Sequence, residues 1–226
     1  MKKLIHLFFV FSIAISSCKK NDPVVPPSPD KYMNAAAGST WNYELVNNTL
    51  STTNLYTLAS TSRDSSINGK PYHVYTNSSG SSNEYLNISG NNYYGFRSLP
   101  AALGGSSIEN IYLKDNVAAG TSWNDTYAIT LSNFPLSITV TNTISEKGIN
   151  KTINGTTYSN VIHVTTALAV KIAGLPLPAG ALQADIQNFY APKVGMILSS
   201  NKININYSGI VDNTDQVTSL KSANIK

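Results

Sequence analysis

The chain of 226 residues has one cysteine, Cys18, and no other thiol follows it. A disulfide, a catalytic thiolate and a cysteine-ligated metal site are therefore excluded for the chain after residue 18. Histidine is almost as scarce, since the chain has three, of which only His73 and His163 follow Cys18. Both are expected in strands, and without a third histidine or a cysteine they do not make a zinc site.

Charged side chains are scarce as well. They make up 12% of the chain, whereas about 25% is usual in a soluble domain, and serine, threonine and asparagine fill the polar positions instead. The formal net charge is +4, and no cluster of four or more lysines and arginines occurs. Nucleic acid is therefore not expected as a partner, because its binding depends on a concentrated positive surface.

Motifs of the common catalytic and cofactor sites are missing. There is no Gly-x-Ser-x-Gly nucleophile turn, no P-loop and no Gly-x-Gly-x-x-Gly dinucleotide motif. The carboxylates are spread along the chain, and no pair stands out as acid and base. The segment Asp-Asn-Thr-Asp at 212–215 lacks the ligand spacing of an EF-hand loop and is expected to be a solvated turn. We therefore expect neither an enzyme nor a protein with a metal or cofactor.

No hydrophobic run is long enough to cross a bilayer. The longest apolar stretch, residues 4–15, has about twelve residues, whereas a spanning helix needs roughly twenty. It follows Met-Lys-Lys and precedes Ser16 and Ser17, which gives a basic region, an apolar region and small residues. This order is typical of a secretory signal, so residues 1–17 are predicted to be a cleaved signal peptide.

Residues 15–18, Ile-Ser-Ser-Cys, end this signal. They resemble the lipobox of bacterial lipoproteins, in which the signal is cut before the cysteine. The resemblance implies that Cys18 carries a thioether-linked diacylglyceryl group and an acylated amino terminus, with chains such as palmitate. Three acyl chains would hold the protein to a membrane essentially permanently. The alternative is that Cys18 is an incidental small residue in an ordinary signal.

Proline follows the cysteine. Residues 18–33 contain four prolines, which exclude a helix or a central strand and favour extended polyproline II, so they are predicted to be a tether. At about 3.1 Å per residue, such a tether spans roughly 40 Å. The lysine-rich start and the Ser/Thr/Asn-rich body resemble outer-membrane lipoproteins of Bacteroidetes-type bacteria. That resemblance implies attachment to the cell outer membrane, and leaves open whether the protein faces the periplasm or the cell surface.

Helical periodicity is nearly absent, and alternation of polar and apolar residues replaces it from residue 38 onward. Such alternation is typical of antiparallel strands with one buried and one solvated face, and it is clearest at residues 40–46, 137–144 and 202–207. Hairpin turns are predicted at Asn-Gly 68–69, Asn-Gly 154–155 and Gly-Asn-Asn 90–92. Residues 34–226 are therefore expected to form one all-β domain.

Two parts of the chain resemble each other. Gly-Ser-Thr-Trp-Asn at 38–42 precedes the first Asn-Gly pair, and Gly-Thr-Ser-Trp-Asn at 120–124 precedes the second. Both tryptophans of the protein lie in this motif. The pattern predicts a duplicated β-meander, with pseudo-repeats at about 38–98 and 120–210, in which each tryptophan anchors half of the core. Chance similarity in a chain rich in Asn, Thr and Gly is the alternative.

One stretch departs from the alternation. Residues 173–180 form an apolar loop, and residues 181–188 are expected to make two helical turns. Residues 189–198 then return to the sheet with a Tyr-Ala, Gly, strand sequence that resembles small lipoproteins built on a curved antiparallel sheet, including half-barrel carriers of the LolA/LolB kind. The predicted fold is thus a curved antiparallel sheet, a half-barrel or open barrel, with an internal duplication and one short helix.

Four residues are candidates for ligand binding. Tyr94 and Phe96 share one face of a predicted strand, where they either stack on a sugar ring or pack across strands. Leu175 and Leu177 lie in the apolar loop, which either enters a membrane, lines the mouth of a cavity or caps the sheet. We therefore expect a non-catalytic, membrane-anchored binding module for a lipid or other apolar ligand. The alternative is a structural or adhesive surface protein that binds a glycan or another envelope protein.

Overall fold

Segments in which polar and apolar residues alternate form β-strands, and these strands make up most of the described chain. The computed structural model describes residues 30–98, 107–131, 134–208 and 210–226. Within these ranges it contains thirteen strands and no helix. The strands are β1 (Thr40–Asn47), β2 (Thr52–Ile67), β3 (Lys70–Asn77), β4 (Glu84–Ser89), β5 (Asn92–Ser98), β6 (Ser107–Lys114), β7 (Ser122–Leu131), β8 (Phe134–Ile153), β9 (Thr156–Ile172), β10 (Leu175–Pro176), β11 (Leu182–Ala191), β12 (Gly195–Tyr207) and β13 (Ile210–Asn224).

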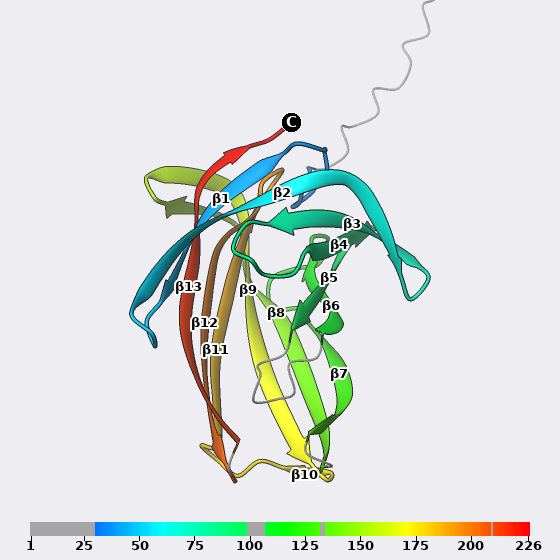
Figure 1. Cartoon of the computed structure of the whole chain (residues 1–226), viewed down its shortest axis with the longest axis vertical. Helices are drawn as coiled ribbons and strands as arrows, with labels where there is room; N and C mark the ends of the chain where they lie inside the picture. Colours follow the sequence, from blue (N-terminus) through cyan, green and yellow to red (C-terminus); the bar gives the residue numbers. More distant parts are fainter. Residues whose placement is uncertain (1–29, 99–106, 132–133, 209) are drawn as a thin grey trace, which may run out of the picture.

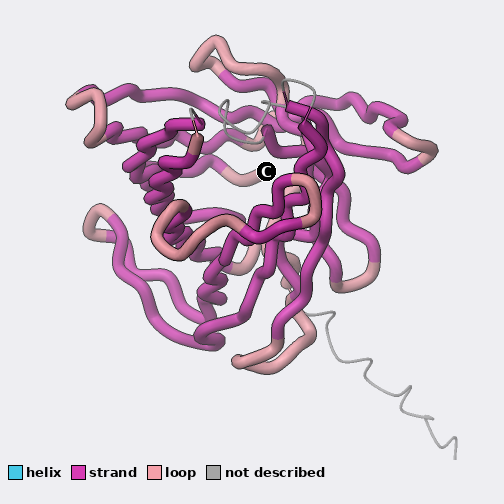
Figure 2. The backbone as a smooth tube through the Cα atoms, turned by 90° about the horizontal axis from the view of Figure 1, so that it is seen from below, coloured by secondary structure: helices cyan, strands magenta, loops and turns pink. Residues whose placement is uncertain are grey.

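All strands belong to one antiparallel sheet. Their order is β6-β5-β4-β3-β2-β1-β13-β12-β11-β9-β8-β7, and β10 pairs with β9. In Figure 1, β8, β9, β11, β12 and β13 run along the long axis of the molecule, whereas β1 and β2 curve across its upper end. Seen along that axis, the strands encircle the centre (Figure 2). The sheet forms a nearly closed barrel, which confirms the predicted curved antiparallel sheet.

Asn-Gly pairs make the tight turns of two long hairpins. Asn68 and Gly69 connect β2 to β3 with φ values of 52° and 77°. Asn154 and Gly155 connect β8 to β9 with φ values of 48° and 83°. Two consecutive positive φ values are what a type I′ turn requires, and this turn matches the twist of a hairpin. Gly90, with a φ of 62°, turns β4 into β5. The three predicted hairpins are confirmed.

The predicted helix at residues 181–188 is wrong, since these residues belong to strand β11 apart from the first. β11 pairs with β12 along its length and with β9 from Ile186 to Tyr190. Eight residues are too few for a helix that lacks tertiary support. Pairing with two neighbouring strands instead satisfies the backbone, and Leu182, Ala184 and Ile186 alternate with more exposed polar residues as a strand requires.

Three clusters of buried side chains make up the core. Trp41 belongs to the first and Trp123 to the second, whereas the third is aliphatic and includes Ile138. Trp41 is fully buried and Trp123 is 9% exposed. Each indole N–H donates to a backbone carbonyl at 2.7 Å, that of Val194 for Trp41 and that of Ile111 for Trp123. Both tryptophans are therefore fixed by packing and by a hydrogen bond.

The two tryptophans occupy corresponding places in two halves of the barrel, β1 to β6 and β7 to β13. Trp41 is the second residue of β1, and Trp123 is the second residue of β7. In each half a long strand, the Asn-Gly turn and a strand with a histidine follow, namely His73 in β3 and His163 in β9. The duplication stays a prediction, and these correspondences support it.

The two halves meet at two junctions, and the first is an ordinary strand pair. β1 and β13 pair along the backbone from Thr40 opposite Asn224 to Asn47 opposite Gln216, with one bulge after Asn42. The first and last strands of the barrel are therefore neighbours.

The second junction lies between β6 and β7, which are the two ends of the strand order and do not pair along the backbone. Side chains of β7 and β8 donate to the backbone of β6 instead. Trp123 Nε1 and Asn142 Nδ2 donate to the Ile111 carbonyl at 2.7 Å and 3.0 Å. The Tyr127 hydroxyl donates to the Glu109 carbonyl at 2.6 Å. We call this contact the β6–β7 seam.

Residues 1–29 lie outside the described residues, and with them the predicted signal peptide, Cys18 and most of the predicted tether. Within the described part of the chain, no helix is long and apolar enough to cross a membrane.

Candidate functional site

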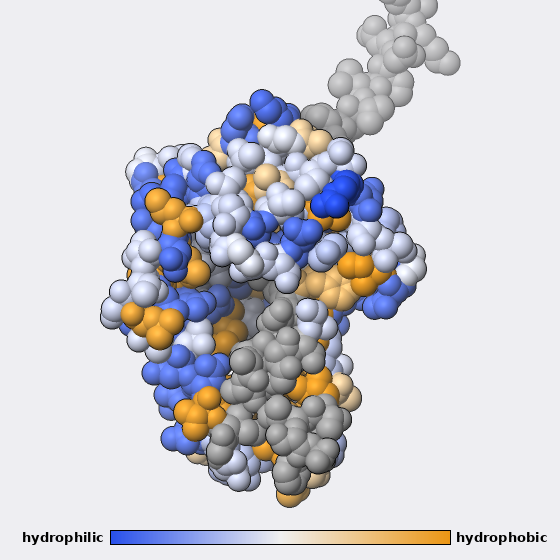
Figure 3. All heavy atoms as spheres, viewed as in Figure 1, coloured by the Kyte–Doolittle hydropathy of each residue, from blue (hydrophilic) through white to orange (hydrophobic). Residues whose placement is uncertain are grey.

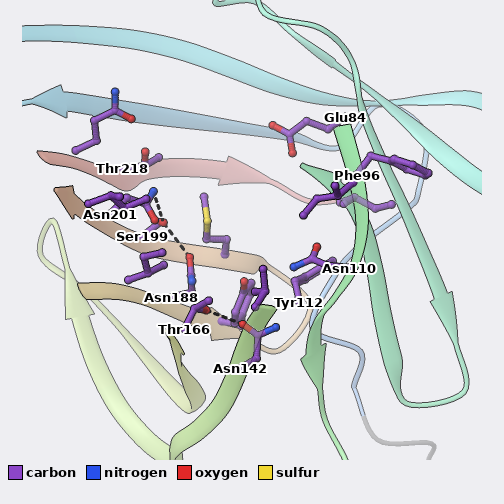
Figure 4. A pocket seen from close by; sticks show the side chains of 18 of the residues that line it. Glu84, Phe96, Asn110, Tyr112, Asn142, Thr166, Asn188, Ser199, Asn201 and Thr218 are labelled. Carbon is purple, nitrogen blue, oxygen red and sulfur yellow. Dashed lines mark hydrogen bonds between the residues drawn. The ribbon is translucent and has the colours of Figure 1, made fainter. Parts of the chain in front are cut away.

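The barrel contains a cavity of about 570 Å³. Side chains from β1, β2, β4 to β6, β8, β9, β11 to β13 and the N-terminal segment line it, as Figure 4 shows for most of them. Small-molecule sites usually have volumes of about 300–1,000 Å³. The interior of this barrel therefore has room for a ligand.

Amides and hydroxyls line one wall of the cavity. Thr166 Oγ1 in β9 donates to Asn142 Oδ1 in β8 at 2.6 Å. Ser199 Oγ in β12 donates to Asn188 Oδ1 in β11 at 2.9 Å. Asn201 Nδ2 lies 3.4 Å from the Ser199 hydroxyl. We call these five residues the polar belt; their hydrogen bonds with one another are drawn in Figure 4.

Asn110 faces the polar belt from β6. Its side chain points into the cavity (Figure 4), and the residue is 7% exposed. Among the described residues, its Oδ1 is the only buried side-chain nitrogen or oxygen without a hydrogen-bond partner. The residue opposite it in β5 is Gly95, which has no side chain that could donate. The cavity wall therefore holds one acceptor that the protein itself does not use.

A layer of aliphatic side chains lies beside the polar residues. Each member of this layer lies two residues along its strand from Asn110 or from a residue of the polar belt. The members are Ile108, Val140, Leu168, Ile186 and Ile203. All five line the cavity and belong to or pack against the aliphatic core cluster. Because every second residue of a strand has the same orientation, this spacing keeps both layers on the inner face. The cavity is therefore amphipathic.

The N-terminal segment contributes Tyr32 and Met33 to the cavity wall. The Tyr32 amide donates to the Tyr93 hydroxyl at 3.0 Å, and the Tyr32 hydroxyl donates to the Asn160 carbonyl at 2.7 Å. Met33 passes over Gly195, where φ is 94° and a Cβ would lie 2.9 Å from the Met33 sulfur. The last residues of the predicted tether, 30–33, are thus packed on the barrel.

Charged side chains are scarce among the described residues that line the cavity. Among the described residues that line it, Glu84 is the only acid, and there is no lysine or arginine. Burial raises the pKa of Tyr43 well above its ordinary value, and the neighbouring Tyr56 and Glu84 raise it further. The neutral phenol of Tyr43 donates to the Met196 carbonyl at 2.8 Å. The part of the wall that the structure describes therefore offers no lysine or arginine to a ligand.

Asp64, His73 and Ser60 form a chain of hydrogen bonds outside the cavity. Asp64 Oδ1 lies 2.9 Å from His73 Nδ1, and His73 Nε2 lies 2.8 Å from Ser60 Oγ. The order of groups is that of a serine hydrolase triad. Ser60 is only 4% exposed, however, and its backbone N–H donates to the Ser39 carbonyl at 2.9 Å. The hydroxyl is not accessible to a substrate, and its N–H is not available to an oxyanion.

The second half repeats the pairing of acid and histidine without a hydroxyl. Glu146 Oε2 lies 3.0 Å from His163 Nδ1, and Gln187 Oε1 lies 2.6 Å from His163 Nε2. The imidazole stacks on Phe189 at 4.1 Å between ring centroids. In both halves the acid and the histidine face each other beside a bulge. Among the described residues, no three His, Cys, Asp or Glu side chains gather as metal ligands would.

Of the four predicted ligand-binding residues, only Phe96 lines the cavity. Its ring packs edge to face on Tyr72 at 5.1 Å. Tyr94 lies under the Lys70 ammonium, which is 4.8 Å from the ring centroid. Both aromatic rings thus contact other side chains of the sheet, as expected from cross-strand packing.

The predicted apolar loop does not line the cavity. Leu175 is 71% exposed in β10, whereas Leu177 packs against the aliphatic core cluster at that end of the barrel. The packing of Leu177 agrees with capping, one of the three roles predicted for this loop, and its role stays a prediction.

Exposed apolar residues do not form one large patch in the part of the molecule that is described. The large ones are Leu50 between β1 and β2, Leu55 in β2, Leu175 in β10 and Val211 in β13. On the face seen in Figure 3, apolar residues form separate small groups among polar ones. Scattered apolar residues of this kind are usual on protein surfaces.

Sequence reasoning missed Asn110 and the whole polar belt. The chain is rich in Ser, Thr and Asn on both faces of its strands, so nothing in the pattern distinguishes the inward-facing polar residues. The register of the sheet is needed to identify them.

No protein-family model matches the chain, and no curated protein matches it in sequence. Among solved structures, the chain is similar to a crystal structure from Parabacteroides distasonis that is described as a "putative lipoprotein". The match has a TM-score of 0.52 and 11% sequence identity, and covers 87% of this chain and 100% of the other. At this identity the similarity shows a shared fold.

Proposed function

We propose that the protein is a lipid-anchored, non-catalytic binding protein of the bacterial cell envelope, which holds an apolar or amphipathic ligand inside the barrel. The observation that carries this proposal is the cavity of about 570 Å³. A structural or adhesive protein needs a filled core, whereas a carrier needs an unfilled one. Tyr94 lies under the Lys70 ammonium, so its ring offers little surface on which a sugar could stack.

The anchoring part of the proposal rests on the sequence. The signal-like residues 1–17, the lipobox-like residues 15–18 and the proline-rich segment that follows together favour a lipidated Cys18. Such an anchor would hold the barrel near a membrane, and we propose the outer membrane on the resemblance to Bacteroidetes lipoproteins. Apolar and amphipathic molecules are concentrated in and near a bilayer, so a protein anchored there can encounter them as ligands.

The non-catalytic part of the proposal rests on the site. Ser60 in the Asp64–His73–Ser60 chain is buried, and the polar belt consists of amides and hydroxyls without a base. Among the described residues that line the cavity, no second carboxylate, histidine or lysine accompanies Glu84.

Native mass spectrometry of residues 19–226, purified without detergent from a bacterial cytoplasm, tests ligand binding. We expect a reproducible extra mass of several hundred daltons. The double variant Leu168→Trp/Thr214→Trp places two indoles in the cavity and should abolish the extra mass. Its matched control, Ala169→Trp/Asn213→Trp, changes the next residue on each strand, which is exposed, and should retain it.

If the unmodified chain shows only the mass of the polypeptide, the proposal is contradicted and the adhesive role is favoured instead. An extra mass that survives in the inward-facing double variant would place the ligand elsewhere on the protein. For the anchor, metabolic labelling with an alkyne palmitate analogue should modify the full chain and not its Cys18→Ser variant.

A further inference from the structure

We infer that the ligand of the barrel is an uncharged, single-chain amphiphile whose head group donates a hydrogen bond to Asn110. This inference rests on the proposed ligand binding and adds the chemical class of the ligand. It combines the unused acceptor on β6, the absence of positive charge in the cavity wall and the size of the cavity.

The unpaired Asn110 Oδ1 is a hydrogen-bond acceptor without a donor among the described residues of the protein. Asn110 Oδ1 is buried and unpaired, although buried polar groups in proteins are nearly always hydrogen-bonded. The belt residues across the cavity do not supply the donor, because Asn142 Nδ2 donates to the Ile111 carbonyl and the Ser199 hydroxyl donates to Asn188. A ligand hydroxyl or amide N–H placed beside Asn110 would satisfy it.

The described part of the wall has no positive charge to pair with an anionic head group. A carboxylate or phosphate in the cavity would lose its water, meet no lysine or arginine among the described lining residues, and lie in the same cavity as Glu84. Burying an unpaired anion is strongly unfavourable. The ligand that this wall accepts is therefore not an ionised fatty acid or a phospholipid.

The size of the cavity limits the ligand to one chain. The volume of about 570 Å³ lies within the range of about 300–1,000 Å³ of sites that hold drug-sized molecules. A single-chain amphiphile is of this size, whereas a two-chain lipid is considerably larger. The chain itself would lie against the aliphatic layer, which begins at Ile108, two residues from Asn110.

Three probes with the same twelve-carbon acyl chain test the inference. They are 1-monolaurin, which has two hydroxyl donors, methyl laurate, which has none, and laurate, which is an anion at about pH 8. Binding to residues 19–226, which hold the whole barrel, is measured by calorimetry below the aggregation concentration of each probe. We expect monolaurin to bind at least about tenfold more tightly than either of the others, as one good hydrogen bond allows.

The variant Asn110→Leu removes the acceptor and should weaken monolaurin binding about tenfold, while methyl laurate binds equally well or better. The matched control is Asn204→Leu, because Asn204 is exposed on β12 between the inward-facing Ile203 and Ile205. It should leave all three affinities unchanged. If Asn110→Leu does not fold, the comparison of the three probes on the unmodified chain still decides.

Equal affinity for monolaurin and methyl laurate, or tighter binding of laurate, would overturn this inference and leave ligand binding intact. The same holds if a co-purified ligand is found but none of the three probes binds. If no probe binds and no ligand co-purifies, the proposed function itself fails.

Discussion

The two junctions between the halves of the barrel differ in what holds them together. At β1 and β13, backbone groups pair from Thr40 opposite Asn224 to Asn47 opposite Gln216. At the β6–β7 seam, the hydrogen bonds to the backbone of β6 come from side chains of β7 and β8, chiefly Trp123 and Asn142. The same geometric task, joining two meanders into a barrel, is thus performed by the backbone on one side and by particular residues on the other.

The difference shows which part of the barrel depends on particular side chains for its closure. A backbone pair tolerates most substitutions, whereas the seam depends on the donors that reach Ile111 and Glu109. The seam also forms part of the cavity wall, since Asn110 and Asn142 line it. Substitutions at the seam should therefore affect the cavity directly.

The largest effect is expected from Trp41→Ala. Trp41 is fully buried, packs on Tyr75 at 5.9 Å and donates to the Val194 carbonyl, so its loss leaves a cavity and an unpaired carbonyl. We expect a loss of about 3–5 kcal/mol in the free energy of unfolding, measured by urea denaturation. Trp123→Ala should fall at the lower end of this range, because Trp123 is 9% exposed.

Hydrogen exchange separates the two tryptophans further. Trp123→Ala should speed amide exchange in β6 and β7 and leave β1 and β13 close to unmodified rates, whereas Trp41→Ala should speed exchange throughout. Uniform acceleration by both variants would mean that the seam opens only with the whole barrel.

A smaller effect is expected from Asn142→Ala at the seam. Asn142 donates to the Ile111 carbonyl and accepts from the Thr166 hydroxyl, so the variant leaves a partly buried hydroxyl without its acceptor. We expect a loss of about 1–3 kcal/mol by urea denaturation. Asn42→Ala is the control at the first junction, because the exposed Asn42 amide bonds only to other side chains, and it should cost less.

Alkaline pH should weaken the seam through Tyr127. Burial, then Asp125 and Glu109, raise the pKa of Tyr127 above its ordinary value of 10.0. Because the folded-state pKa exceeds that of the unfolded chain, the stabilisation is complete below about pH 10 and is lost as the pH rises above it. The free energy of unfolding should fall as the pH rises from about 10 to about 12, and it should fall less in Tyr127→Phe. An identical fall in both proteins would assign the effect to other tyrosines.

The smallest effects are expected from the two acids beside the histidines. The carboxylates of Asp64 and Glu146 are 68% and 54% exposed, so their pairs with His73 and His163 are strongly screened by water. Asp64→Asn and Glu146→Gln should each change the free energy of unfolding by less than about 1 kcal/mol. A larger loss in one of them would show that the two halves use this pair differently.

The sequence predicted the sheet because the determinants of the sheet are local. Alternation and Asn-Gly turns depend on neighbouring residues, and the turns at Asn68 and Asn154 lie where they were predicted. The helix predicted for residues 181–188 failed because the pairing of β11 with β9 and β12 is a long-range effect.

The cavity could not be predicted in the same way. Whether Asn110 faces inward depends on the register of β6 with β5 and on the bulge between Tyr93 and Tyr94. Trp123 was assigned to the core from its type and its place in the repeated motif, and nothing in the sequence shows that it joins two strands. Leu175 and Leu177 were selected for being apolar, whereas the site is distinguished by polar residues in an apolar setting.

The pairing of the first strand with the last also has a consequence for the order of folding. The Asn34 amide bonds to the Lys226 carbonyl across 192 residues, and β13 is the last strand to be synthesised. Contacts between such distant residues form slowly, because the chain between them must first be ordered. A chain that has been synthesised only as far as β12 therefore lacks the strand that joins β12 to β1, so the barrel and its cavity form only when Ile210–Asn224 pairs.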